Sequence, residues 1–468
     1  MKHINLIYLS VFFIVTSILS FFNIIYSYYF NLYLNLNTYI YTLAVSVFLG
    51  VLFYLIKNDK IKFTIYDKIL TILTGYVLIP LVISIPFYLS IYNISFINSY
   101  FEAISGFTST GFTIFENIKH IDQSLIIWRS SSQWVGGLYF LFSIITLIDI
   151  FDSNFKKSLT NFTSFNKSET LKKIFKIFIL YILLTICIFI TLNIFNIRTF
   201  NSLNLAMTIV SSGGFLPTNN LLGILTNDTQ IIVFSLLILI SFFSIFLSYN
   251  LIFIKNRNID FFYEDLNLLY YFLVLLLIFF FFLNIDNNFV TLFLSITSSI
   301  SNIGVSLDDS PKNLSFIFLI LLIIGGSFFS TSSGIGFLKL YSLFKYSINE
   351  ILSYSRPKNI YVNKILFTKI NFKEAEIYKY FLSVLIFVIS LLFLSILLTS
   401  NGIDFESSFK LSILTIMNTV NSSMYGLNGF NFHDLHFFTK FYLILFMIIG
   451  RIELLTLLII SKKFLFKN

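Results

Sequence analysis

The stretch that decides the fold is Ser105-Gly106-Phe107-Thr108-Ser109-Thr110-Gly111-Phe112, a polar, glycine-bearing segment between two long apolar runs. Three segments of the same kind follow it: Ser211-Ser212-Gly213-Gly214-Phe215, Ser301-Asn302-Ile303-Gly304-Val305 and Asn421-Ser422-Ser423-Met424-Tyr425-Gly426. Non-helical backbone at membrane depth is tolerated only where it is buried in protein or lines a watery cavity. Four such interruptions predict one shared polar path, and the simplest such path is an ion pore.

The composition places the chain in a lipid bilayer. Of its 468 residues, 57% are hydrophobic and only 11% are charged, which excludes a soluble protein of this size. Hydropathy predicts about ten transmembrane helices. They are expected near residues 6–27, 39–56, 69–91, 126–150, 174–195, 230–254, 268–283, 314–344, 378–399 and 438–460. The single cysteine, Cys187, excludes an intramolecular disulfide, and we expect it in the apolar core.

The distribution of basic residues predicts the orientation of the chain, because Lys and Arg near the ends of spans stay on the cytoplasmic side. The connections rich in basic residues are 57–68, 152–176, 255–264, 339–373 and the tail 462–468. All five fall on one side if the spans alternate. Both termini are therefore predicted to be cytoplasmic, and the glycine segments enter from outside. This asymmetry accounts for the net charge of +9, and no nucleic-acid-binding module is visible.

After an N-terminal transmembrane hairpin (residues 1–66), the order of helix, short segment and helix repeats four times. The predicted pore units are 67–171, 172–263, 264–372 and 373–468. In each unit, an apolar stretch too short to span precedes the glycine segment: 99–105, 201–210, 289–299 and 406–420. The sequence thus predicts an all-α polytopic membrane protein with four pseudo-symmetric helix–pore loop–helix units around one pore.

The glycine segments are candidate cation-binding loops. A half-helix whose C-terminal end faces the pore directs partial negative charge at a cation. The glycine that follows can take backbone angles that expose carbonyl groups, which replace the water around a dehydrated ion. The candidate ion-binding residues are Thr108, Ser109, Thr110, Gly111, Ser212, Gly213, Gly214, Asn302, Ile303, Gly304, Ser422, Ser423 and Met424.

These motifs resemble the TrkH branch of the Trk/Ktr/HKT superfamily of potassium-transporting membrane subunits, over nearly the whole chain. The similar stretches include Phe101-Glu102-Ala103, the segment from Ser105 to Phe112, Trp128-Arg129, Gln133-Trp134-Val135-Gly136-Gly137, Ser212-Gly213-Gly214-Phe215, Gly325-Gly326-Ser327 and Gly450-Arg451-Ile452-Glu453. The resemblance implies potassium uptake through a selective pore in a bacterial-type plasma (inner) membrane. It also implies a homodimer and a cytoplasmic nucleotide-binding regulatory partner of the TrkA type.

A second set of residues predicts a break in the inner helix of the third unit, because several glycines and hydroxyl residues weaken a helix there. The set is Gly325, Gly326, Ser327, Ser330, Thr331, Gly334 and Gly336. The resemblance implies that this loop is a gate beneath the filter, whereas a glycine-lined helix contact is the alternative. Arg451 is expected to face the pore near the gate, to tie to carbonyls near Ser327, or both. Arg129 is expected to anchor at the outer interface and to brace the first pore loop, and Asp308-Asp309 either attracts cations or is a solvated loop.

The fourth segment departs from the family pattern. Aligning Asn421-Ser422 with the family's asparagine pair puts Met424 at the filter glycine, and methionine does not take a positive φ without strain. The alternative register puts Gly426 on the axis. The sequence therefore predicts cation conduction but not strict potassium selectivity.

Other functions remain open at this level. A non-selective or sodium-permeable cation transporter of the same fold is one alternative, and a homologue that no longer conducts is another. A secondary transporter would need acidic or histidine residues within the spans, and the spans offer almost none. No paired metal ligands or activated nucleophile indicate an enzyme, and no cofactor is expected beyond potassium as the transported ion. Basic inner connections suit either a soluble partner or anionic membrane lipid.

Overall fold

The computed structural model describes residues 4–56, 64–147, 170–245, 247, 263–282, 288–354, 374–427 and 430–452. These residues form α-helices, short 3-10 turns and loops, with no β-strand among them. The fold class predicted from the sequence is therefore confirmed. The helices are α1 (Leu6–Tyr29), α2 (Leu36–Leu55), α3 (Ile65–Ile83), α4 (Ile85–Tyr88), α5 (Phe96–Phe107), α6 (Gln123–Leu147), α8 (Thr170–Ile194), α9 (Thr199–Val210), α10 (Asp228–Phe242), α12 (Tyr263–Phe282), α13 (Phe289–Ile300), α14 (Ser315–Ile324), α15 (Phe337–Ser353), α16 (Glu374–Ser400), α17 (Phe405–Ile416) and α18 (Phe437–Arg451).

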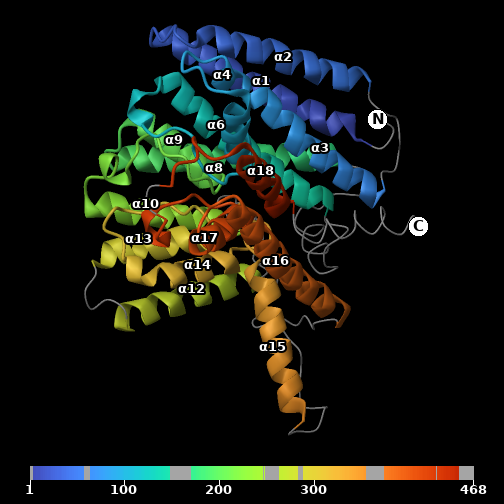
Figure 1. The fold of residues 1–468 in the computed structure, drawn as a ribbon, viewed down its shortest axis with the longest axis vertical. Coiled ribbons are helices and arrows are strands. Elements are labelled where there is room, and N and C mark those ends of the chain that lie inside the picture. The colour runs from blue at the N-terminus through green and yellow to red at the C-terminus, as the bar shows by residue number, and fades with distance from the viewer. Residues whose placement is uncertain are drawn as a thin grey trace.

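The first two helices form a closely packed hairpin along the edge of the molecule, at the top of Figure 1. The Ser10 hydroxyl donates to the Gly50 carbonyl at 2.8 Å, and the Ser20 hydroxyl donates to the Tyr39 carbonyl at 2.7 Å. These bonds satisfy small polar side chains where the two backbones approach, a pattern typical of helix pairs in membranes. Among the described residues, the hairpin packs mainly against α3, α4 and α6. The Tyr26 ring of α1 also lies near the Phe200 ring of α9, with 6.5 Å between their centroids.

The remaining helices repeat as outer helix, short pore helix and inner helix. The four pore helices are α5, α9, α13 and α17, and each has 12 residues. At about 1.5 Å per residue, such a helix is roughly 18 Å long and too short to cross a bilayer of about 30 Å. Each therefore enters the membrane part-way and must return as a loop.

The packing of these helices closes into a ring. The inner helix of each unit contacts the pore helix of the next: α6 contacts α9, α10 contacts α13, α14 contacts α17, and α18 contacts α5. The last contact joins the fourth unit to the first across the whole length of the chain. One cyclic arrangement of four similar units therefore surrounds a common centre.

One inner helix ends earlier than the sequence predicts, and another is broken where the sequence predicts a break. The expected helix 230–254 ends at Phe242, since Phe243 is extended. The amides of Ser327 and Ser332 donate to the Phe242 and Ser241 carbonyls at 3.0 and 3.3 Å. These contacts satisfy carbonyls at the end of α10, so tertiary structure ends this helix. In the third unit, the predicted break is present between Ile324 and Phe337.

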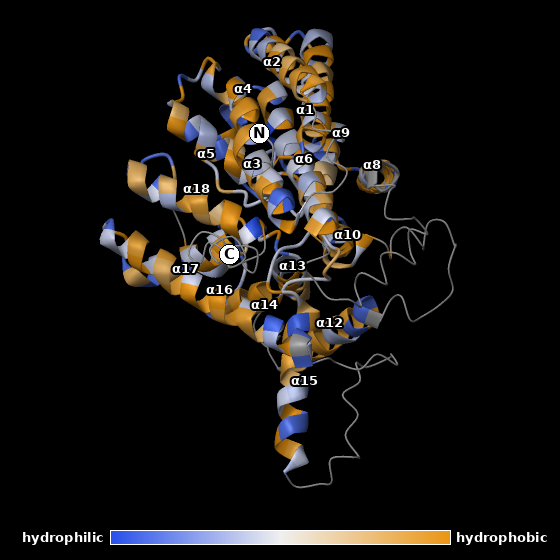
Figure 2. Cartoon of the chain, turned by 90° about the vertical axis from the view of Figure 1, so that its right-hand side faces the viewer, coloured by the Kyte–Doolittle hydropathy of each residue, from blue (hydrophilic) through white to orange (hydrophobic). Residues whose placement is uncertain are grey.

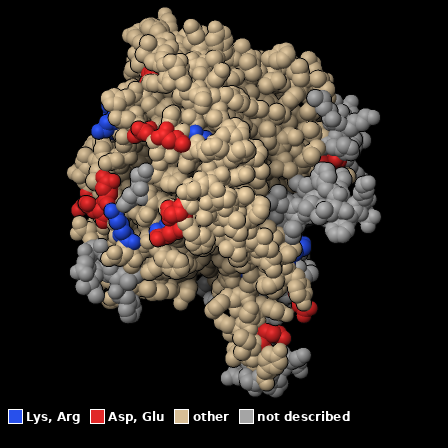
Figure 3. Space-filling view, viewed as in Figure 1, with Lys and Arg blue, Asp and Glu red and all other residues tan. Residues whose placement is uncertain are grey.

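The molecule carries a broad apolar surface. Six helices within the described residues are long and apolar enough to cross a membrane, namely Leu6–Tyr29, Leu36–Leu55, Ile65–Tyr88, Phe175–Ile194, Glu264–Phe281 and Glu376–Ser400. Figure 2 shows α16 almost uniformly hydrophobic, and Figure 3 shows a face mostly free of charged side chains. Cys187 is exposed on α8 rather than buried in the core, because the apolar solvent here is lipid.

Helix α15 differs from the others, because it projects away from the body of the molecule in both ribbon views (Figures 1 and 2). It begins at the break after α14 and carries polar stretches. The predicted basic connections lie wholly or partly outside the described residues, as do the C-terminal tail and Glu453. The predicted unit boundaries stay predictions.

Candidate functional site: four converging pore loops

The four pore helices end in the same hydrogen-bonded turn. The second residue after each C-cap donates its amide to a carbonyl five residues earlier, which is the Schellman arrangement. These bonds run from Thr110 to Ser105 (2.9 Å), from Gly213 to Thr208 (2.7 Å), from Ile303 to Ser298 (3.2 Å) and from Thr419 to Leu414 (3.0 Å). They define equivalent positions in the four loops.

One residue in each turn has left-handed backbone angles. These residues are Ser109 (φ 58°), Ser212 (φ 54°), Asn302 (φ 59°) and Asn418 (φ 50°). This conformation costs a non-glycine residue about 1–2 kcal/mol, and asparagine tolerates it best. Four residues held in this way indicate that the surrounding contacts fix the path of each loop.

In each loop, the residue two positions after the left-handed one lies near a common centre. By the shared register these residues are Gly111, Gly214, Gly304 and Val420. A Cβ added at Gly111 or Gly214 would lie 3.0 or 2.4 Å from the Val420 Cβ, and one added at Gly304 would lie 3.1 Å from the Val420 Cγ1. The four loops therefore meet around one point.

The predicted register of the fourth loop is corrected by the structure. The predicted stretch 406–420 is helical only to Ile416, one turn shorter than expected. Val420 therefore takes the ring position that the sequence alignment gave to Met424. Met424 lies in a later 3-10 turn, Ser423–Tyr425, buried beside the Ser299 hydroxyl. Gly426 closes that turn in left-handed conformation (φ 73°), and a Cβ added there would be nearest to Lys410 and Ser315 rather than to the residues of the ring.

Ser422 and Ser423 lie next to the ring rather than in it. The Ser423 hydroxyl is 3.0 Å from the Ser306 hydroxyl and 3.3 Å from that of Ser310. These contacts join the stretch after the fourth loop to the stretch after the third. Asp308 nearby is exposed and accepts a bond from the Asn220 side chain at 3.0 Å.

Side-chain hydrogen bonds connect the loops to each other and to the inner helices. The Asn418 amide donates to the Thr110 hydroxyl at 3.0 Å and to the Met447 carbonyl at 2.9 Å. The Asn302 amide donates to the Leu322 carbonyl at 3.0 Å. These amides bond to α18 and α14, the inner helices of their own units. Residues with left-handed angles thus also anchor the loops.

Two further bonds complete this set. The Ser212 hydroxyl donates to the Ser301 carbonyl, which joins the second loop to the third. Within the first loop, the Thr108 and Thr110 hydroxyls lie 2.7 Å apart. Three of the hydroxyl residues predicted for the filter, Thr108, Thr110 and Ser212, are therefore hydrogen-bonded within or between the loops.

A buried ion pair lies behind the first two loops. Arg129 Nε of α6 is 2.8 Å from Glu102 Oε1 of α5, and both side chains are at most 1% exposed. The guanidinium also donates to the Thr113 hydroxyl at 3.0 Å and lies 4.2 Å from the centre of the Phe215 ring. Glu102 also accepts bonds from the Ile114 amide at 2.9 Å and from the Thr113 hydroxyl at 3.1 Å. The bracing role predicted for Arg129 thus fits its contacts with both loops.

The loop between α14 and α15, residues 325–336, is a tight hairpin. The Ile335 and Gly336 amides donate to the carbonyls of Ile323 and Ile324 at 3.0 and 3.1 Å. Gly325, Gly334 and Gly336 all have positive φ, and a Cβ added at Gly334 would lie 2.6 Å from the Gly325 Cα. Only glycine fits where the two strands of the hairpin touch.

One of the predicted hydroxyl residues, Ser330, bonds within this hairpin. The Ser330 hydroxyl donates to the Ser327 carbonyl at 2.6 Å and lies 2.7 Å from the Ser332 hydroxyl. A Cβ added at Gly326 would lie 2.5 Å from the Phe242 carbonyl, so the hairpin lies tight against the end of α10. The loop is thus a built element with its own internal bonding.

Arg451 connects this hairpin to the first pore loop. Its guanidinium donates to the Ser333 hydroxyl at 2.5 Å, to the Thr331 carbonyl at 3.1 Å and to the Ser109 hydroxyl at 3.5 Å. It lies 4.0 Å from the centre of the Phe140 ring and is fully buried. Both sequence interpretations of Arg451 are compatible with this position, because one side chain reaches the hairpin and the filter.

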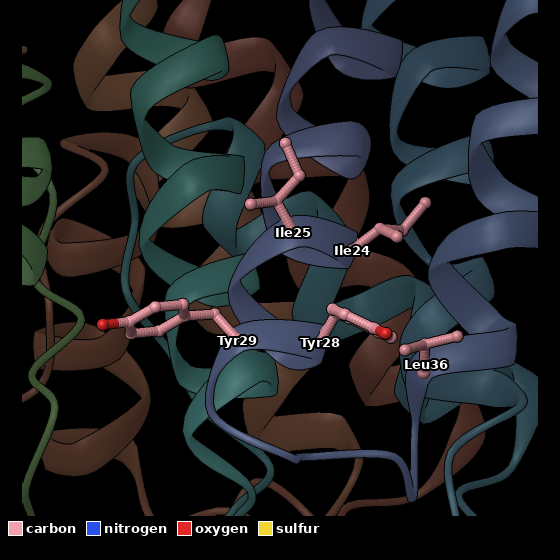
Figure 4. A pocket seen from close by; sticks show the side chains of 5 residues that line it. All are labelled: Ile24, Ile25, Tyr28, Tyr29 and Leu36. Atoms are coloured by element: carbon pink, nitrogen blue, oxygen red, sulfur yellow. The ribbon is translucent and has the colours of Figure 1, made fainter.

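One hollow of the molecule lies beside the loops, and another lies away from them. A cavity of about 50 Å³ lies between the hairpin and α6, lined by Arg451, Ser143, Ser327, Ser333 and Lys339 among others. A hollow of about 530 Å³ lies at the junction of α1 and α2, where Figure 4 shows Ile24, Ile25, Tyr28, Tyr29 and Leu36. The second hollow is an apolar surface feature away from the ring, so the small cavity beside Arg451 is the one that belongs to the site.

Several residues of this site were not predicted from the sequence. Asn418 and Val420 were assigned to a helix, although Met417-Asn418-Thr419-Val420 parallels Ser301-Asn302-Ile303-Gly304. Gln133 of α6 accepts a bond from the Phe215 amide at 3.2 Å. Glu264 accepts one from the Phe328 amide at 2.9 Å, and Asp265 accepts one from the Ser244 amide at 2.8 Å. A buried acidic pair at the start of an apolar helix was the available signal for the last two.

Comparison with known proteins agrees with this geometry. No protein-family model matches the chain. The Trk system potassium uptake protein TrkG of Escherichia coli is 23% identical over 442 residues, covering 90% of this chain and 89% of TrkG. TrkH of Salmonella typhimurium is 22% identical over 391 residues, 79% of each chain. These relatives are transport proteins.

A solved structure extends the comparison to the fold. The crystal structure of the potassium transporter TrkH from Vibrio parahaemolyticus superimposes with a TM-score of 0.79 at 20% identity, over 97% of this chain and 98% of that one. The resemblance to the TrkH branch is thereby confirmed. The chain is a membrane protein homologous to the TrkG and TrkH potassium uptake proteins, and it has the fold of TrkH over nearly its whole length.

Proposed function

We propose that this protein takes up potassium across the plasma membrane through a pore at the centre of its four loops. The names of its relatives support the ion, and the convergence of the loops supports the route. The observation that carries the proposal is the identical turn after four 12-residue helices. These turns bring four helix C-termini, each with partial negative charge, toward one point inside the membrane.

The proposed ion-binding residues follow the structural register. The first three loops contribute Thr108, Ser109, Thr110 and Gly111, then Ser212, Gly213 and Gly214, then Asn302, Ile303 and Gly304. The fourth contributes Asn418, Thr419 and Val420 in place of Ser422, Ser423 and Met424. Backbone carbonyls of these loops replace the hydration shell of the ion. The membrane potential drives entry, at about 2.3 kcal/mol per charge per 100 mV.

The hairpin 325–336 and Arg451 are the proposed gate. The Arg451 guanidinium bonds to both the hairpin and Ser109 of the first loop. Its fixed positive charge raises the energy barrier to the passage of a cation. Opening requires the hairpin to leave Arg451, Phe242 and Glu264, to which it is bonded. The gate is therefore closed by several bonds that a partner on the cytoplasmic side has to break.

The remaining parts of the proposal, which concern topology and partners, follow from the resemblance to the TrkH branch. We propose that both termini are cytoplasmic, that two copies form a homodimer, and that a nucleotide-binding subunit of the TrkA type regulates the gate. Membrane lipid covers the apolar surface, including the hollow in Figure 4. Neither a cofactor nor nucleic acid has a role in this scheme.

The test uses a cell that lacks its own potassium uptake. Wild type is expected to restore growth at low potassium and to take up rubidium. Gly111→Ala is expected to abolish both, because Gly111 has a φ of 81° and an added Cβ would lie 3.1 Å from the Gly214 Cα. Gly223→Ala is the matched control, since the nearest atom to its added Cβ is 3.8 Å away. Rubidium uptake that survives Gly111→Ala in a folded protein would overturn the proposed route.

A further inference from the structure

The ring of loops contains three glycines and one valine. The amides of Gly111 and Gly304 donate to Ser105 and Ser298, and the chain-wide register puts Gly214 and Val420 at the same level. Cβ atoms added at the glycines would lie between 2.4 and 3.1 Å from side-chain atoms of Val420. Because a Cβ lies about 1.5 Å from its Cα, the isopropyl group lies against all three glycine backbones. It therefore occupies space at the centre of the ring.

The backbone of the ring also departs from fourfold symmetry. Gly111 and Gly304 have φ of 81° and 78°, whereas neither Gly214 nor Val420 has a positive φ. A β-branched residue adopts positive φ only with severe strain. The first and third units lie opposite each other in the cyclic packing order, as do the second and fourth. The backbone of the ring is therefore twofold rather than fourfold in character.

Ion selectivity depends on the number and field strength of the groups that coordinate a dehydrated cation. An apolar side chain at the centre lowers that number, because its methyl groups take up space that carbonyl-coordinated ions would occupy. Apolar constrictions also oppose the entry of water and ions. Both effects act at the level of Gly111, Gly214 and Gly304.

We infer that Val420 is the residue that sets the selectivity and the rate of this pore. Its side chain limits cation flux and weakens the preference for potassium over sodium. Cations pass when the isopropyl group moves aside, so the filter contains its own constriction in addition to the hairpin. This inference rests on the proposed function, because it assigns a determinant within the same filter.

The test compares variants of the full-length protein reconstituted in liposomes, with rubidium and sodium uptake measured against an imposed membrane potential. Val420→Gly is expected to raise rubidium uptake by about tenfold, the factor given by a barrier about 1.4 kcal/mol lower. Sodium uptake rises less, so the ratio of rubidium to sodium uptake increases. Val420→Ala is expected to fall between wild type and Val420→Gly in both measurements.

The matched control is Val305→Ala. Val305 is also a buried valine in a loop, one position beyond Gly304. The substitution Val305→Ala removes the same two methyl groups as Val420→Ala, but outside the ring. It is expected to leave the rubidium-to-sodium ratio unchanged. If Val420→Ala and Val420→Gly, shown to be folded by size-exclusion chromatography, keep the wild-type flux and ratio, Val420 is not the determinant. If wild type and every variant transport neither ion, the proposed function fails together with the inference.

Discussion

Arg451 is a costly residue for a membrane protein, because a charge within a span must find partners or water. Here its guanidinium bonds to Ser333, Thr331 and Ser109 and lies against the Phe140 ring. The planar fork of arginine suits several acceptors held at fixed angles, which a lysine ammonium does not match. Arg451 thus bonds both to the hairpin and to the first pore loop.

Two substitutions of Arg451 distinguish the effect of its positive charge on cation flux from the effect of its hydrogen bonds. Arg451→Ala is expected to raise rubidium flux severalfold in liposomes that lack any regulatory partner, because the positive charge and the anchor of the hairpin are both lost. Arg451→Lys keeps the charge but not the forked bonding, so an intermediate flux is expected. An unchanged flux in Arg451→Ala would remove the barrier role assigned to this residue.

The Arg129–Glu102 pair makes a prediction about stability. Removing one partner of a fully buried pair leaves an uncompensated charge, which costs about 3–5 kcal/mol. Arg129→Met is therefore expected to lower the thermal midpoint of the detergent-solubilised protein markedly. The double variant Glu102→Gln/Arg129→Met is expected to recover part of the loss, since no isolated charge remains.

The Lys410–Glu406 pair of α17 is the matched control for this experiment. Its atoms lie 2.6 Å apart, but Glu406 is 77% exposed. An exposed pair of this spacing contributes only about 0.3–0.5 kcal/mol. Lys410→Met is thus expected to leave the thermal midpoint nearly unchanged, and equal losses in Arg129→Met and Lys410→Met would contradict the bracing role of Arg129.

Among the helices, the inner helix α6 packs closely against the C-terminal ends of two pore helices. A Cβ added at Gly136 would lie 1.8 Å from the Phe107 carbonyl, and one added at Gly137 would lie 2.7 Å from the Ser211 Cβ. Phe107 ends α5 and Ser211 caps α9. Adjacent glycines thus let the ends of two pore helices touch one inner helix.

Gly136→Ala is expected to destabilise the folded protein by about 1–3 kcal/mol or more, because the added methyl group meets backbone that cannot rotate away. Folded protein recovered after extraction, measured by size-exclusion chromatography, is expected to fall. Gly50→Ala offers a comparison in a spanning helix, since its added Cβ would meet the flexible Ile14 side chain at 3.3 Å. Normal recovery of Gly136→Ala would show that α5 and α6 pack further apart than described.

The ends of the pore helices show what sequence could predict at this scale. The predicted stretches 201–210 and 289–299 end within one residue of α9 and α13. The stretch 406–420 was one turn too long, since no glycine lies at Val420 and Asn418 alone marks the turn. The end of α17 is fixed by bonds from Asn418 to Thr110 and Met447, partners distant in sequence. Local sequence patterns do not reveal such distant partners. The ring position of the fourth loop was therefore predicted four residues too late, at Met424 instead of Val420.

At the scale of the whole molecule, hydropathy and repeat order predicted the fold, because a membrane permits few ways to satisfy the backbone. The order of units in the ring follows chain order, with α18 closing onto α5. The early end of α10 was not predictable, because its carbonyls accept bonds from a hairpin some ninety residues later, as the Phe242–Ser327 bond shows. Hydropathy and repeat order predicted helices and the order in which they repeat, whereas long-range bonds decided where several of them end.

The orientation of the whole molecule is the last prediction, and the chain suits a labelling experiment because Cys187 is its only cysteine. Since Cys187 is exposed on α8, it is first replaced as Cys187→Ser. In that background, Asp309→Cys, after the third filter loop, is expected to react in intact cells with a maleimide that does not cross membranes. Tyr354→Cys, at the end of α15 and 87% exposed, is expected to react only after permeabilisation. The two positions lie at opposite ends of the third inner helix, so one membrane crossing separates them. The reverse pattern would invert the positive-inside assignment and place the filter loops on the cytoplasmic side, whereas labelling of both in intact cells would contradict a crossing between them.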